Sequence, residues 1–176
     1  MSNSFSLSPY NQDVVDMVTI SVQTCLILEH TQEFEKNDFV EKLVKILPML
    51  YFKYVMIEYQ DKELDGYLQT FVSEEDYNLV VSSVSELLGN DDSYLEVFME
   101  DMRYSDTPIA SSISENLGDI YQELKDLAGN FQTGDENVMT DAVYAALLSF
   151  KDNWGQKLLN CLRALHFIYV SPSETE

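Results

Sequence analysis

The chain has 176 residues, of which 31 are acidic and 10 are Lys or Arg, so its formal net charge is −21. This charge argues against nucleic-acid or anionic-lipid partners, because both kinds of contact depend on Lys and Arg side chains. The length suits one domain with a real core, and a hydrophobic content of 45% is typical of a globular protein.

The two ends of the chain are polar, so we expect disordered tails at residues 1–8 and 171–176 around a single domain at 9–170. The first residues lack the basic and apolar regions of a secretory signal, and no uncharged apolar run is long enough to span a bilayer. Two cysteines, Cys25 and Cys161, cannot make a disulfide framework. By elimination, these features predict a cytoplasmic protein.

Apolar residues recur at spacings of three and four along almost the whole chain, which is the period of a helix packed on one side. The first predicted helix runs from about Pro9 to His30, and its broad apolar surface indicates burial from several sides. The second begins near Asn37 as N-cap and continues through Pro48, where we expect a kink. Its apolar stripe consists of Val40, Leu43, Leu47, Leu50, Tyr54 and Ile57.

A polar loop follows at 60–71, and then a third helix. Ser73 and Asp76 have the spacing of a capping box at its start, and Gly89 is placed to end it. A short helix is predicted around 94–102. Thr107 followed by Pro108 has the pattern of an N-cap and first helical residue.

The next helix is predicted to reach Phe131 and has the most regular stripe, with four acidic residues on what we take to be its solvent face. That stripe consists of Ile113, Leu117, Ile120, Leu124, Leu127 and Phe131, and the acids are Glu115, Asp119, Glu123 and Asp126.

The last helix is predicted to run from Glu136 to Tyr169, which at 1.5 Å per residue is roughly 50 Å. A chain of this size is only about 40 Å across. The apolar stripe steps by four twice in succession around Trp154, so we expect a bend beside it at Gly155. We also expect Trp154 to be buried against the helix that contains Leu117 and Leu124.

These elements together predict an all-α, single-domain, irregular antiparallel bundle of five to seven helices. They do not point to a catalytic centre. Neither His30 nor His166 follows a Glu by three residues, which excludes a ferritin-like di-iron site. Acid pairs at that spacing are about as frequent as chance predicts, and nucleophile and phosphate-loop motifs are absent. We therefore assign no catalytic residue, no metal ligand and no cofactor.

Two unusual segments remain as candidates for an interaction surface. Residues 51–59 include four aromatic residues, so some of them must face outward unless neighbouring elements cover them. Residues 100–108 place Arg103 among three acids, so we expect it to form a bidentate salt bridge that fixes this corner. The alternative is that the same corner binds a cation or a basic peptide. The candidate surface residues are Tyr51, Phe52, Tyr59, Arg103, Tyr104 and Asp106.

Several segments give the chain a resemblance over residues 12–167. They are Ile46–Tyr51, Glu75–Tyr77, Tyr94–Glu96, Tyr104–Pro108, Asp119–Lys125, Trp154–Leu158 and Leu165–His166. The chain resembles a family of bacterial helical domains of unknown function, and the segments at 104–108 and 154–158 are the most specific. The resemblance implies a single all-helical cytosolic domain and carries no activity, cofactor or site residue.

The function is therefore open. A non-enzymatic acidic interaction module with a protein partner is the leading hypothesis, and the alternative is a carboxylate-based, divalent-metal-dependent hydrolase acting on a nucleotide or phosphoester. Four or more acids converging in one buried pocket would favour the hydrolase. The oligomeric state is open too, since the apolar surface of the first helix fits burial either within a monomer or in a dimer.

Overall fold

Helices form where the three- and four-residue apolar spacing predicts them. The computed structural model describes residues 7–60, 62–64, 66–96 and 109–171. Its elements are the α-helices α1 (Gln12–Glu29), α2 (Lys36–Val55), α3 (Glu74–Leu88), α4 (Ile113–Phe131), α5 (Glu136–Ser149) and α6 (Gly155–Val170), the 3-10 turns η1 (Thr31–Glu33) and η2 (Gly89–Asp92), the π-helical segment η4 (Phe150–Trp154) and the strands β1 (Ser93–Leu95) and β2 (Ala110–Ser112).

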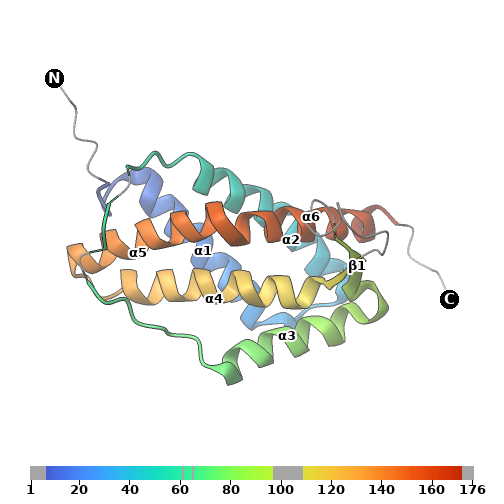
Figure 1. Cartoon of the computed structure of the whole chain (residues 1–176). Helices are drawn as coiled ribbons and strands as arrows, with labels where there is room; N and C mark the ends of the chain where they lie inside the picture. Colours follow the sequence, from blue (N-terminus) through green and yellow to red (C-terminus); the bar gives the residue numbers. More distant parts are fainter. Residues whose placement is uncertain (1–6, 61, 65, 97–108, 172–176) are drawn as a thin grey trace.

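Four helices form a closed ring of neighbours, in which α1 packs on α2, α2 on α6, α6 on α4 and α4 on α1. The remaining two helices lie outside this ring and both pack on α4, α3 from one side and α5 from another. In Figure 1, α4 crosses the middle of the molecule, α3 lies below it, and α5 and α6 run above it. The α1–α4 side of the ring is thus covered by α3, and the α2–α6 side is not covered by any other helix of the described part.

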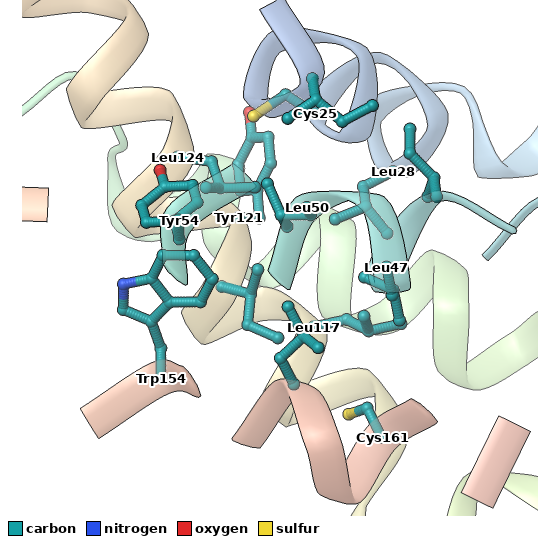
Figure 2. Close-up of a cluster of buried hydrophobic side chains, with 14 of the residues drawn as sticks. Cys25, Leu28, Leu47, Leu50, Tyr54, Leu117, Tyr121, Leu124, Trp154 and Cys161 are labelled. Carbon is teal, nitrogen blue, oxygen red and sulfur yellow. The ribbon is translucent and has the colours of Figure 1, made fainter. Parts of the chain in front are cut away.

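One hydrophobic core joins all six helices. Figure 2 shows part of it, with Leu47 and Leu50 of α2 between Leu28 of α1 and Leu117 of α4. The predicted all-α, single-domain fold is confirmed. The predicted helix number holds as well: the described part has six α-helices, or five if α5, η4 and α6 are taken as one. The predicted disordered tails fall mostly on residues outside the described ranges and stay a prediction.

The sequence predicted the start of α3 correctly but not the start of α2. The capping box of α3 is confirmed, because the Ser73 hydroxyl accepts a hydrogen bond from Asp76 N–H and the Asp76 carboxylate accepts one from Ser73 N–H. The start of α2 was wrong: the helix begins at Lys36, with Glu35 rather than Asn37 in the N-cap position and no side-chain cap bond. α2 then continues unbroken through Pro48.

The short helix predicted at 94–102 is wrong in its described part. Residues 93–95 form β1, which pairs antiparallel with β2 in the register Tyr94 to Ser111. β2 runs directly into α4, whose N-cap is Ser112. Because these residues are extended, α4 cannot begin at the predicted Thr107–Pro108 pair, which itself lies outside the described residues.

The irregular step in the last apolar stripe is a π-helical segment. Gly155 N–H donates to Phe150 O, five residues back, so this turn holds one residue more than an α-helical turn. That extra residue explains why the stripe steps by four twice. A side chain at Gly155 would place its Cβ 2.6 Å from Phe150 O, so the turn requires glycine there.

Trp154 is fully buried at this turn, as predicted. Its nearest ring partners are Tyr54 of α2, at 4.7 Å between ring centroids, and Phe150 within the same π-helical turn, at 4.8 Å. Figure 2 shows the indole directly beside Tyr54. Trp154 therefore fastens α6 to α2, a contact that the sequence pattern did not predict.

Candidate functional site

The aromatic segment at the end of α2 divides into an inner and an outer part. Tyr54 is buried, and its hydroxyl lies 3.1 Å from the Ser21 hydroxyl. Tyr51 is half-buried against Phe150, and Tyr59 is half-buried against Tyr144 of α5. Of the three candidate residues here, only Phe52 points mainly to solvent, with 58% of its surface exposed.

The other three candidate residues, Arg103, Tyr104 and Asp106, lie outside the described residues. Their role in an interaction surface stays a prediction, as does the predicted salt bridge of Arg103.

Phe52 belongs to an apolar stripe on the outer side of α2. Met49 is 55% exposed and Val55 57%, and Met56 at the end of the helix is 43% exposed. Spacings of three and four place these side chains on one helix face. This stripe was visible in the sequence, because its residues are the apolar residues of α2 that do not belong to the predicted core stripe.

α6 also exposes apolar residues. They are Leu159, Phe167, Tyr169 and Val170, and they lie on more than one side of the helix, because Phe167 and Tyr169 are two residues apart. The two helices are antiparallel neighbours: Tyr54, near the end of α2, meets Trp154 just before α6, and the start of α2 and the end of α6 line one hollow. The exposed apolar residues of α2 and α6 therefore belong to two neighbouring helices.

Charge is distributed very unevenly over the helices. α2 and α6 together hold six Lys and Arg against two acids, and α6 has no acid at all. The other four α-helices hold thirteen acids and one Lys. In a chain of net charge −21, this pair of helices is locally positive.

Not all of these basic side chains point outward. Lys36, Lys53 and Lys157 form salt bridges to Asp91, Asp16 and Asp119 on neighbouring elements. Lys42, Lys45 and Arg163 are exposed, as is His166, although Lys45 is paired with Glu41 and Lys42 lies over the Phe34 ring. We define the α2–α6 surface as the apolar Met49, Phe52, Val55, Met56, Leu159, Phe167, Tyr169 and Val170 with the basic Lys42, Lys45, Arg163 and His166.

Two hollows flank the end of α6 and widen this surface. One, of about 490 Å³, lies between α6 and β1 and is lined by Arg163, His166 and Phe167. The other, of about 810 Å³, lies between α6, η2 and the start of α2. Phe167 and Ile168 line both hollows, as do Asn90 and Asp91 of η2, so the two hollows adjoin at the end of α6.

A buried polar network forms the wall behind the first hollow. The Glu96 carboxylate accepts hydrogen bonds from Tyr94 Oη at 3.1 Å and from Asn160 Nδ2 at 2.5 Å. Asn116 Nδ2 of α4 donates to the same Tyr94 oxygen. Burial raises the pKa of Tyr94, so its phenol stays protonated as the donor to Glu96. This network ties β1 to α4 and α6.

Of the four acids in the row on α4, Glu115 is exposed, as its spacing suggested, and the other three are not. Asp119, Glu123 and Asp126 are half-buried beneath neighbouring elements. Asp119 accepts hydrogen bonds from Tyr77 of α3 and Lys157 of α6, and Asp126 accepts one from Phe71 N–H. Burial raises the pKa values of Glu123 and Asp126. Asp119 thus joins α4 to α3 and α6, whereas Asp126 joins α4 to the loop before α3.

Metal-ligand clusters and membrane-spanning helices are two further features that would bear on function. Within residues 7–60, 62–64, 66–96 and 109–171, no three or more His, Cys, Asp or Glu side chains are placed to hold a metal ion. No helix in that part of the chain is long and apolar enough to cross a membrane.

Comparison with known proteins supports the fold. Residues 8–171 match a protein family described as a domain of unknown function, DUF5063. The crystal structure of protein BF1032 from Bacteroides fragilis is similar, with 32% sequence identity and a TM-score of 0.82 over 96% of this chain and 99% of that chain. No curated protein matches. The chain belongs to the DUF5063 family of helical domains, whose function is unknown.

Proposed function

We propose that this chain is a non-enzymatic protein-interaction module whose binding site is the α2–α6 surface. One observation carries the proposal: of the sixteen large apolar residues that are exposed in the described part, eight belong to this surface. They lie on two adjacent helices, whereas the other eight are spread over the rest of the fold.

Physical chemistry favours an interface as the reason for such a surface. Apolar area removed from water contributes about 25 cal/mol per Å², so a stripe of this kind gains free energy when a partner covers it. Isolated apolar residues on a protein surface are common, but contiguous groups rimmed by charge mark interaction sites. The residue types agree as well, because aromatic residues, Met and Arg are enriched in protein interfaces.

As part of this proposal, we infer that the protein is cytoplasmic. Cys25 and Cys161 are free thiols, both buried, which is compatible with a reducing compartment. Burial raises the pKa of Cys25 to about 12, so this thiol is inert at neutral pH.

The test compares two substitutions that change equally exposed apolar residues on opposite sides of the molecule. Phe52 on α2 and Leu79 on α3 are each 58% exposed. The wild type, Phe52→Ser and Leu79→Ser are each produced with an affinity tag in the native cell and captured. We expect specific co-purifying proteins with the wild type and Leu79→Ser, and their loss with Phe52→Ser. Equal capture by all three variants would refute the α2–α6 surface as the binding site.

A further inference from the structure

The hollow between β1 and the end of α6 has the make-up of a small-molecule site. Figure 1 shows β1 beside the end of α6. The volume of the hollow, about 490 Å³, lies within the range of about 300–1,000 Å³ that is usual for such sites. We infer that this hollow binds a small organic anion, in which a carboxylate or phosphate group is attached to an apolar body. The bases of the hollow, the pairing of its acids and its apolar lining lead to this ligand.

Two basic side chains of α6 line the hollow and have no acidic partner in the part of the chain that the structure describes. Arg163 and His166 are three residues apart, so they are neighbours on one helix face. Six lysines of the described part form salt bridges, whereas neither Arg163 nor His166 pairs with an acid there. A guanidinium binds carboxylate or phosphate through two parallel hydrogen bonds. Arg163 is therefore available to an anion from outside the chain.

The acids at the hollow are held by donors of the protein itself. Asp91 belongs to the lining and forms a salt bridge with Lys36 of α2. Glu96 is buried behind the wall, where its carboxylate accepts hydrogen bonds from Tyr94 Oη and Asn160 Nδ2. A cationic ligand would have to compete with Lys36 for Asp91. An anionic ligand meets basic groups whose donors are not used by any described acid.

The apolar part of the lining favours a ligand with an apolar body. Leu95 of β1 and Phe167 of α6 are both exposed in the hollow, and Ala164 and Ile168 add further apolar surface. Covering such surface contributes about 25 cal/mol per Å² removed from water. A bare inorganic anion would leave these side chains in water and would be repelled by the net charge of −21. An organic anion gains both from the apolar contact and from the basic groups.

Three probes with the same aromatic body and different head groups test the class of ligand. They are 1-naphthoate, 1-naphthyl phosphate and the neutral 1-naphthamide, each titrated into the full chain and followed by the backbone amide signals in NMR spectra. We expect at least one anion to shift the signals of Leu95 and Phe167 and to bind at least about tenfold more tightly than the amide. The tighter of the two anions identifies the head group as carboxylate or phosphate. Equal binding of all three probes, no binding of either anion, or shifts confined to other parts of the chain would overturn the inference.

A pair of charge-removing variants tests the role of Arg163. Arg163→Gln changes an exposed residue of the hollow, and Lys151→Gln is the matched control, because Lys151 is also exposed but does not line the hollow. We expect Arg163→Gln to weaken binding of the tighter anion at least about tenfold and to leave binding of the amide unchanged, because only the anion loses a charged hydrogen bond. Lys151→Gln should bind both probes like the wild type. An equal loss in the two variants would show a general effect of net charge and would overturn the site.

The protein-interaction function proposed above is tested separately from this hollow. Phe52 does not line the hollow, so Phe52→Ser should bind the anionic probe like the wild type. Loss of the captured proteins with Phe52→Ser therefore bears only on the proposed function, and loss of the probe with Arg163→Gln bears on the anion site. Weaker probe binding by Phe52→Ser would contradict the placement of the anion between β1 and α6.

Discussion

The two long sides of the helical ring differ in what covers them. On the α1–α4 side, α3 buries Val80, Val84 and Leu88. It also reaches α4 closely enough that a Cβ on Gly118 would lie 2.6 Å from Val81. On the α2–α6 side, the described part of the chain supplies no covering helix, and both helices keep exposed apolar residues.

This difference shows that the negative charge is not spread evenly over the helices, as it would be if it served solubility alone. The covered side and its helix α3 are acidic, with four acids and no base on α3 itself. The uncovered helices α2 and α6 hold six Lys and Arg against two acids, and α2 exposes apolar residues at helical spacing. Apolar side chains are thus covered by another helix of the chain on the α1–α4 side, whereas no helix of the described part covers them on the α2–α6 side.

The largest effect is expected at the joint between α2 and α6. Trp154 is fully buried against Tyr54 and Phe150, so Trp154→Ala should lower the free energy of unfolding by about 3–5 kcal/mol, as measured by urea denaturation. Trp154 Nε1 has no hydrogen-bond partner within the described residues, so Trp154→Phe should cost much less. An indole emission maximum like that of free indole in water would contradict the burial.

The contact between α2 and α6 at Trp154 shows which parts of the fold could be predicted from the sequence and which could not. Regular three- and four-residue spacing predicted every long helix, and the doubled step of four located the irregular turn at Trp154. The spacing could not tell that three of the four α4 acids are half-buried, because it does not show which neighbours cover a helix face. The strand at 93–95 was missed because three residues carry too little periodicity.

The candidate site was predictable only in part for a related reason. Phe52 was named from the density of aromatic residues, and it is the one described candidate that faces mainly outward. Tyr51 and Tyr59 are half-buried by Phe150 and Tyr144, which are remote in sequence. The positive character of α2 and α6 was visible in the sequence, but that the two helices are neighbours was not.

The docking of α3 is the next feature to test. Gly118→Leu would force a side chain into the contact with Val81 and Tyr77, and we expect a loss of about 2–3 kcal/mol in unfolding free energy. Gln122→Leu is the matched control, because Gln122 is exposed on the same helix. Equal stability of the two variants would mean that α3 is not closely held on α4.

The start of α3 gives a smaller effect. Ser73→Ala removes the hydroxyl that accepts a hydrogen bond from Asp76 N–H, and should cost about 1 kcal/mol. Ser82→Ala, at an exposed position inside the same helix, should change stability by only a few tenths of that amount. Thermal unfolding of both variants gives the comparison, and a larger loss for Ser82→Ala would count against the cap.

Removing the charge of a half-buried acid of α4 should raise stability at pH 7, whereas the substitutions above lower it. Burial raises the pKa of Glu123 above its ordinary value of 4.5, so the folded state holds this proton more tightly than the unfolded state does. Its contribution to stability is therefore fully present below pH 4.5 and is lost as the pH rises through the folded-state pKa. Glu123→Gln should raise the melting temperature at pH 7 and flatten the pH dependence above 4.5. A lower melting temperature at pH 7 would show that ionised Glu123 is stabilising.

The smallest effect on stability is expected where the largest effect on binding is proposed. Phe52 is mostly exposed and contacts no covering helix in the described part of the chain, so Phe52→Ser should change the free energy of unfolding by less than about 0.5 kcal/mol. Leu79→Ser changes an equally exposed residue on α3, so in dilute protein it should also change the free energy of unfolding by less than about 0.5 kcal/mol. A loss above about 1 kcal/mol for Phe52→Ser alone, growing with protein concentration, would mean that a second copy covers Phe52, because an associated state adds stability that depends on concentration. Urea denaturation at two concentrations, with light scattering on the same samples, distinguishes a surface awaiting another protein from one already closed in a dimer.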